Sequence, residues 1–165
     1  MSYHFFAAIS RMKYIDRWQL MRNSREENLC EHSMEVAMIA HALCVIGNVR
    51  YGKELDADRA AVIGLYHDAS EIITASAPGE KKNPDPAAAQ AAESEHYMRR
   101  LVKAADKLSA LIKCMDETAA GNTEFRTAMQ STRKALDAMA QELPEVRDFM
   151  EDFLPSYGHT LDELA

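Results

Sequence analysis

Three ionisable residues interrupt an otherwise apolar segment, GLYHDASEII, at residues 64–73. His67 and Asp68 are adjacent, and Glu71 follows Asp68 by about one helical turn. Burying such groups without partners costs several kcal/mol each, so something must compensate them. The chemistry that these residue types favour is metal binding or proton transfer.

Two more residues of the same types lie elsewhere in the chain, His32 in CEHSME and Asp106 in VKAADKLSAL. Imidazole and carboxylate together suit a divalent ion such as Mn²⁺, Co²⁺, Fe²⁺, Zn²⁺ or Mg²⁺. Ligands from three helices of one bundle converge only in its interior. His32, His67, Asp68 and Asp106 are therefore candidate metal ligands, although spacing alone also admits buried charges with ordinary partners.

Adjacent residues of a helix point about 100° apart, so His67 and Asp68 reach one ion only near an irregular helix end. The stretch TASAPGEKKNPDP, at 74–86, predicts a loop that supplies such an end. The remaining histidines have no comparable context and are expected to play no part in the site: His4, His41, His96 and His159.

Helical periodicity predicts the elements that position these residues. Residues 29–46 are expected to form one helix that ends near Gly47. Its predicted apolar stripe consists of Met34, Ala37, Met38, Ala42 and Val45. Asp56 or Asp58 caps the next helix.

The second half of the chain reads as three more helices. Asp85 and Pro86 are a typical start for a long helix that Gly121 ends, and two shorter helices follow on either side of Pro144. Thr160 is expected to cap a last turn. No strand or repeat is indicated, so the predicted fold is all-α, a single domain at 1–165 with about five to seven helices.

Composition excludes several classes of protein. The formal charge of −7 argues against a nucleic-acid polymer as partner, and no uninterrupted apolar run approaches the ~18 residues that span a membrane. The N-terminal residues lack an apolar stretch followed by a small-residue cleavage site. Cys30, Cys44 and Cys114 lie in predicted helices without metal-binding spacing, which favours reduced core thiols in a cytoplasmic protein.

The order His…His-Asp…Asp resembles the HD phosphohydrolase superfamily. FFAAISRMKYIDRWQLMRNSREENLCEHSMEVAMIAHAL, YHDASEIIT, LVKAADKLSALIKCMDETAAGNTEF and LPSYGHTLDEL are similar to the bacterial HD-domain 5′-deoxynucleotidases (YfbR-like). They are also similar to the short phage deoxynucleoside triphosphohydrolases (DatZ-like). The likeness covers most of the chain, and RW, EHS, HDASE and KCMDE in this order are together very specific.

This resemblance implies a site and a cofactor. Its metal ligands would be His32, His67, Asp68 and Asp106, holding one Co²⁺, Mn²⁺, Zn²⁺ or Mg²⁺ ion. Its other residues would be Glu71 beside the attacking water, Arg17 and Trp18 around the base and deoxyribose, and Lys82 and Lys103 at the phosphate.

The chain departs from the nucleotidase pattern in two places. Ser76 stands where the nucleotidases carry an aspartate near the scissile phosphate, and Glu80 is the nearest spare carboxylate. The segment between Lys82 and Asp106 is shorter, as in the phage enzymes. The predicted loop at 74–86 offers Lys81 beside Lys82 as cations that could contact a longer phosphate tail.

The resemblance therefore implies a metal-dependent phosphohydrolase that cleaves 2′-deoxynucleotides at the 5′-phosphate ester. A 5′-deoxynucleotidase acting on monophosphates is the leading hypothesis. The alternatives are a triphosphohydrolase that releases triphosphate from a dNTP such as dATP, and a non-catalytic nucleotide-binding protein. The family also implies a homo-oligomer, a dimer or a higher even assembly.

Overall fold

The computed structural model describes residues 3–69 and 86–165, with backbone alone for residues 86–92. These residues form six α-helices and no strand, which confirms the all-α prediction; one isolated bridge joins Asp16 and Asn28. The helices are α1 (Phe5–Ile9), α2 (Leu29–Tyr51), α3 (Ala57–Tyr66), α4 (Pro86–Ala119), α5 (Arg126–Glu142) and α6 (Pro144–Asp152).

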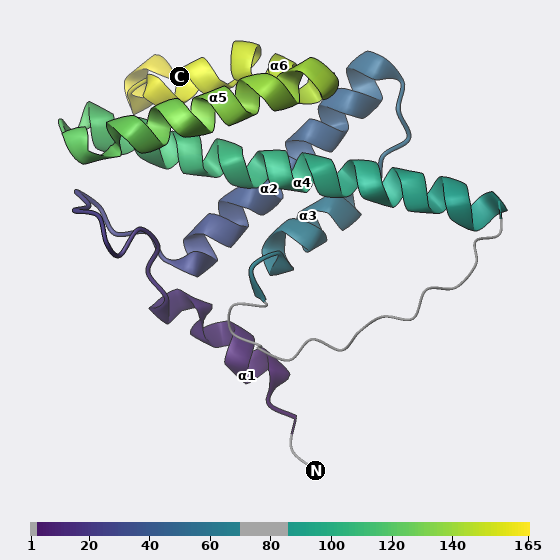
Figure 1. The fold of residues 1–165 in the computed structure, drawn as a ribbon, viewed down its shortest axis with the longest axis horizontal. Coiled ribbons are helices and arrows are strands. Elements are labelled where there is room, and N and C mark those ends of the chain that lie inside the picture. The colour runs from purple at the N-terminus through teal and green to yellow at the C-terminus, as the bar shows by residue number, and fades with distance from the viewer. Residues whose placement is uncertain (1–2, 70–85) are drawn as a thin grey trace.

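The long helix α4 is the central element of the bundle (Figure 1). It crosses α2, packs on α5 along one side and contacts α3 on the other. The contacts of α2 with α3 and α6 complete the bundle. Residues at the start of α2, the end of α3 and the middle of α4 come close together, as the contacts of His32 with Asp68 and Asp106 show.

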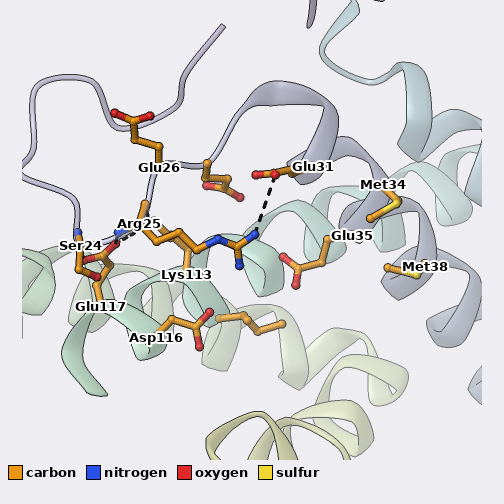
Figure 2. Close-up of a pocket in the computed structure, with 12 residues that line it drawn as sticks. Ser24, Arg25, Glu26, Glu31, Met34, Glu35, Met38, Lys113, Asp116 and Glu117 are labelled. Atoms are coloured by element: carbon orange, nitrogen blue, oxygen red, sulfur yellow. Dashed lines mark hydrogen bonds and ion pairs between the residues drawn. The ribbon is translucent and has the colours of Figure 1, made fainter. Parts of the chain in front are cut away.

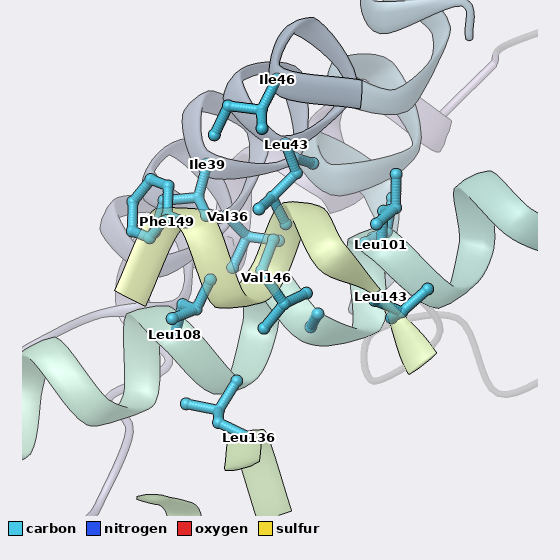
Figure 3. Packing of buried hydrophobic residues seen from close by; sticks show 14 of the residues in the cluster. Val36, Ile39, Leu43, Ile46, Leu101, Leu108, Leu136, Leu143, Val146 and Phe149 are labelled. Atoms are coloured by element: carbon cyan, nitrogen blue, oxygen red, sulfur yellow. The ribbon is translucent and has the colours of Figure 1, made fainter. Parts of the chain in front are cut away.

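The hydrophobic core lies where α2, α4 and α6 meet (Figure 3). Leu43 of α2, Leu108 of α4 and Val146 of α6 are each fully buried. Burying a side chain of this size stabilises the fold by about 1.5–3 kcal/mol. Because this packing fixes α2 against α4, it also fixes the relative positions of His32 and Asp106.

The buried face of α2 differs from the predicted stripe. Met34 and Met38 are 55% and 57% exposed, and Val45 is also exposed. Ala37 of that stripe is buried as predicted, but the buried face otherwise carries residues outside the stripe, such as Val36 and Leu43. The prediction was wrong because α2 carries apolar residues on all its faces, so contacts with α4 and α6, rather than periodicity, decide which face is buried.

The predicted end of α2 at Gly47 was also wrong. The helix continues to Tyr51, and Gly52, with φ of +62°, forms its left-handed cap. Gly47 is a packing residue, since a Cβ there would lie 2.8 Å from Glu145 Oε1 and 2.9 Å from Leu55 Cδ1.

Helix α3 delivers the His67-Asp68 pair as the sequence predicted. Asp56 caps its first turn by accepting from the Arg59 amide, the helix ends at Tyr66, and His67 and Asp68 follow in a turn. Gly64 lets α3 approach α2 closely, because a Cβ there would lie 2.8 Å from the Ala37 Cα.

By length and hydropathy alone α2 could span a bilayer, but 56% of its most apolar window is buried within the protein, as in a core helix.

Cys44 and Cys114 are buried, and burial raises the pKa of each thiol to about 11. Cys30 is exposed, contrary to the prediction of a core residue, and it lies in the first turn of α2.

Replacing Gly64 with alanine should push α3 away from α2. The expected loss in free energy of unfolding is about 1–3 kcal/mol, as for other overpacked cores, even though alanine favours helix by about 1 kcal/mol. Gly158→Ala is the matched control, because a Cβ at Gly158 meets nothing within 4 Å. Urea unfolding of both variants measures the effect, and equal stability would contradict the packing role.

Candidate metal and nucleotide site

Four side chains from α2, the end of α3 and α4 converge on one point. The ligand atoms of His32, His67 and Asp68 all lie within 4.8 Å of one another. Asp106 Oδ1 is 3.0 Å from His32 Nε2 and 3.8 Å from His67 Nε2. His32 is fully buried and the others are partly exposed, so the donor set faces an opening rather than a sealed core.

The chemistry of this donor set fits a divalent ion. His67 Nδ1 lies 2.7 Å from the Gly64 carbonyl, which can only accept, so Nδ1 carries a proton. Its Nε2 is buried and has no hydrogen-bond partner among the described residues. That atom lies 3.1 Å from Asp68 Oδ2, so lone pairs face one another unless a cation or a proton lies between them.

The pKa shifts reflect the same excess of negative charge. Burial lowers the pKa of His67, but the neighbouring carboxylates of Asp106 and Asp68 outweigh it and raise the pKa to about 10. Burial raises the pKa of Asp106, but its contacts with both histidines dominate and hold the pKa well below its usual range. In the absence of a metal ion, a proton on His67 therefore compensates the site.

A hollow of about 430 Å³ opens beside the donors, lined by Arg17, Trp18, Leu29, Asp68 and Asp106 among others. Arg17 Nη2 is 4.0 Å from Asp106 Oδ1, so a guanidinium lies next to the candidate metal-binding carboxylates. The hollow thus combines a cation, an aromatic ring and the donor set, which is the chemistry needed for a phosphorylated heterocycle.

Glu27 orients both pocket residues. Its carboxylate accepts from Arg17 Nη1 at 3.3 Å and from Trp18 Nε1 at 3.1 Å. The indole also packs on Phe125, with ring centroids 5.4 Å apart. Trp18 has φ of +59°, a left-handed conformation that costs a non-glycine residue about 1–3 kcal/mol. Such strain persists only where surrounding contacts hold it.

A buried ion pair on α4 anchors the segment that carries these residues. Glu117 and Lys113 are almost fully buried and lie 2.5 Å apart. Glu117 also accepts from the amides of Ser24 and Arg25, and Lys113 donates to the Arg25 carbonyl. Burial raises the pKa of Glu117, but these hydrogen bonds dominate and lower it strongly. The loop after Trp18 is therefore fastened to α4.

A second cavity, of about 300 Å³, lies between this loop, α2 and α4 (Figure 2). Its lining includes six carboxylates and two cations, Arg25 and Lys113. Arg25 lies 3.9 Å from Glu31, and Lys113 is paired with Glu117. Because the remaining charge is negative, this acid-lined cavity repels nucleotide phosphates, whereas the Arg17–Trp18 hollow offers a guanidinium beside the donor set.

The structure therefore brings six predicted residues together: Arg17, Trp18, His32, His67, Asp68 and Asp106. Lys103 is exposed on α4 and is not among the described residues that line the hollow. Four predicted residues, Glu71, Ser76, Lys81 and Lys82, lie outside the described residues, as does Glu80. All four histidines that lacked context in the sequence are exposed.

Sequence reasoning missed Glu27, Glu35 and Ser109. Ser109 Oγ lies 3.0 Å from His32 Nδ1 and donates to Glu35 Oε2 at 2.6 Å. Glu35 lies three residues and Ser109 seventy-seven residues from His32, and neither belongs to a spacing that signals metal binding. The position of Ser109 one turn after Asp106 was the one available clue.

Comparison with known proteins agrees with this geometry. The sequence model of the family described as "5′-deoxynucleotidase YfbR-like" matches residues 4–94 and 86–157. Proteins named 5′-deoxynucleotidase from Yersinia pestis and Yersinia pseudotuberculosis are 39% identical over 192 aligned positions, covering 98% of this chain and 96% of theirs. The alignment with these relatives has more positions than the chain has residues, and the two ranges that match the family overlap at residues 86–94. Both findings agree with the expected shortening of the segment between Lys82 and Asp106.

Two solved structures share the fold. An HD-domain phosphohydrolase from Listeria innocua superposes with a TM-score of 0.69 at 18% identity, covering 93% of this chain and 88% of that one. A conserved hypothetical protein from Pyrococcus furiosus superposes with a TM-score of 0.63 at 23% identity, covering 94% and 98%. At these identities the likeness concerns the arrangement of helices.

Divalent-ion uptake should release a proton. The pKa of His67 is raised to about 10, so the metal-free ring is protonated at neutral pH and an ion must displace that proton. We expect apparent affinity to rise as pH increases from about 6.5 toward 9. Titration calorimetry of Mn²⁺ in two buffers of different ionisation enthalpy measures the released proton, and identical heats in both buffers would argue against this linkage.

Proposed function

The chain belongs to the YfbR-like 5′-deoxynucleotidase family, and from this membership and the site geometry we propose that it hydrolyses 2′-deoxynucleoside 5′-monophosphates to deoxynucleoside and phosphate. The observation that carries the proposal is the open donor set of His32, His67, Asp68 and Asp106 beside a hollow that holds Arg17 and Trp18.

We propose that these four side chains hold one divalent ion, Mn²⁺, Co²⁺, Zn²⁺ or Mg²⁺. When bound, the ion would supply Lewis acidity and a water of lowered pKa near neutral pH. The unpartnered Nε2 of His67 and the depressed pKa values of both carboxylates support this assignment, because ligand atoms must be free of protons.

The nucleotide would bind with its phosphate toward the donors and its nucleoside in the hollow. The guanidinium of Arg17 would neutralise a phosphate oxygen, and the Trp18 ring would pack on the sugar and base. Glu27 acts as a positioning residue, since it holds both side chains at once. The fastened loop keeps this arrangement preorganised before substrate arrives.

The remaining predicted residues complete the proposal. Glu71, one turn after Asp68 in sequence, would orient or deprotonate the attacking water. Lys82 and Lys103 would contact phosphate oxygens, with Lys81 and Ser76 nearby as additional donors. In the reaction a water oxygen forms a bond to phosphorus, the P–O5′ bond breaks, and the O5′ alkoxide takes up a proton.

A second candidate reaction is attack at the α-phosphorus of a dNTP, which releases triphosphate. The shortened segment near 86–94 favours it, because missing residues leave space for a longer phosphate tail. Ser76 also lacks the negative charge that an aspartate would place beside that tail. For either reaction we propose one catalytic domain at 1–165, working in the cytoplasm as a homo-oligomer.

Product analysis separates the two reactions. Purified protein with Mn²⁺ should release phosphate from dAMP, and Asp68→Ala should abolish both turnover and metal retention. Intact triphosphate released from dATP would instead assign the second reaction. If neither product forms with any of the four ions, the chain is a nucleotide-binding protein and the enzyme proposal fails.

Discrimination against ribose should depend on Arg17 and Trp18. A pocket closed around the 2′ position leaves an added hydroxyl crowded and unpaired, which for such sites costs about 1–3 kcal/mol, or roughly tenfold to 200-fold. We expect kcat/KM for dAMP to exceed that for AMP by a factor in this range, and Trp18→Ala to reduce the ratio. Equal values for the two sugars in the unmodified protein would rule out this role.

A further inference from the structure

The Nδ1 atom of His32 has two hydrogen-bond partners, Arg17 and Ser109, which require different protonation of the ring. The ring is fully buried, and its Nδ1 has two partners on different elements. Arg17 Nη1 is 2.6 Å from Nδ1, and Ser109 Oγ is 3.0 Å from it. On the other side of the ring, Nε2 lies 3.0 Å from Asp106 Oδ1.

The two partners of Nδ1 demand different tautomers. A guanidinium only donates, so the Arg17 contact requires a bare Nδ1 and places the ring proton on Nε2. A protonated Nε2 cannot bind a metal ion. Ser109, in contrast, can accept from a protonated Nδ1, which leaves the Nε2 lone pair facing the other three donors.

Glu35 determines whether Ser109 donates to His32 or accepts from it. A serine hydroxyl accepts from Nδ1–H only if its own proton points elsewhere, and Ser109 donates to Glu35 Oε2 at 2.6 Å. Ser109 is fully buried, so solvent does not compete for its hydroxyl. The chain of donors therefore runs from His32 Nδ1 through Ser109 to the Glu35 carboxylate, which lies on the edge of the acid-lined cavity (Figure 2).

We propose that Ser109 and Glu35 are positioning residues that hold His32 in its metal-binding tautomer. The inference rests on the proposed metal site. It also implies that the contact of Arg17 Nη1 with Nδ1 is given up when the ring proton moves to Nδ1, which leaves the guanidinium, already in the lining of the hollow, free to contact substrate. Metal binding thereby prepares the cation that contacts substrate.

Zn²⁺ affinity tests the proposal without reference to turnover. Loss of an outer-sphere partner of a metal-binding histidine typically weakens binding about 10- to 100-fold. We expect losses in this range for Ser109→Ala and Glu35→Met by chelator competition. Glu35→Gln keeps an acceptor oxygen and should lose less. Ser131→Ala and Glu151→Met are matched controls at exposed positions and should bind Zn²⁺ as the unmodified protein does.

A proton NMR signal separates positioning from a general loss of structure. In the Zn²⁺-loaded protein, labelled with ¹⁵N-histidine, the His32 Nδ1–H should resonate downfield and exchange slowly with water. Ser109→Ala should abolish that protection, and Glu35→Met should reduce it. Unmodified protein that binds no Zn²⁺ would overturn both the metal site and this inference. Unchanged Zn²⁺ affinity and an unchanged Nδ1–H signal in both variants would overturn the inference alone.

Discussion

Mutual compensation between two imidazoles and two carboxylates is the interaction on which the functional part of this molecule depends. His32, His67, Asp68 and Asp106 come from different elements, so their approach requires α2, α3 and α4 to be fixed against one another. The two carboxylates place an excess of negative charge at the donor set, and this charge raises the pKa of His67. Partly burying these carboxylates without a cation lowers the stability of the bundle, and a bound cation compensates their charge.

The helices supply this geometry with few special residues. Gly64 permits close approach of α3 to α2, and α3 ends at Tyr66, so that His67 and Asp68 follow in the turn after the helix. The buried pair of Lys113 and Glu117 then fastens the loop after Trp18 to α4. Stability and the geometry of the candidate site are thus linked, because the same α4 holds Asp106, the anchor of the loop and part of the core.

Much of this arrangement could be predicted from the sequence, and the failures have physical reasons. Residue types and helical spacing made His32, His67, Asp68 and Asp106 candidates, the family resemblance supplied the full ligand set, and the structure brings the four side chains together. The exposed face of α2 was misassigned because Met34 and Met38 satisfy the same periodicity as its buried residues. Periodicity cannot distinguish apolar faces when packing partners decide between them.

Contacts between segments that are distant in sequence could not be predicted from residue types and spacing. Glu27 bonds Arg17 and Trp18 only because residues 15–17 return alongside residues 27–29, and Ser109 meets His32 only in the folded bundle. The left-handed backbone of Trp18 likewise has no local signal, since glycine or asparagine is the usual residue there. Resemblance to a family located Arg17 and Trp18, but the structure was needed to show what holds them.

The central claim is that one divalent ion binds between His32, His67, Asp68 and Asp106. Anomalous diffraction from crystals grown with Co²⁺ measures this most directly. We expect one peak at about 2.0–2.2 Å from the two Nε2 atoms and from one oxygen of each carboxylate. A peak in the acid-lined cavity beside Glu31, Glu35 and Asp116, with none between the two histidines, would contradict it.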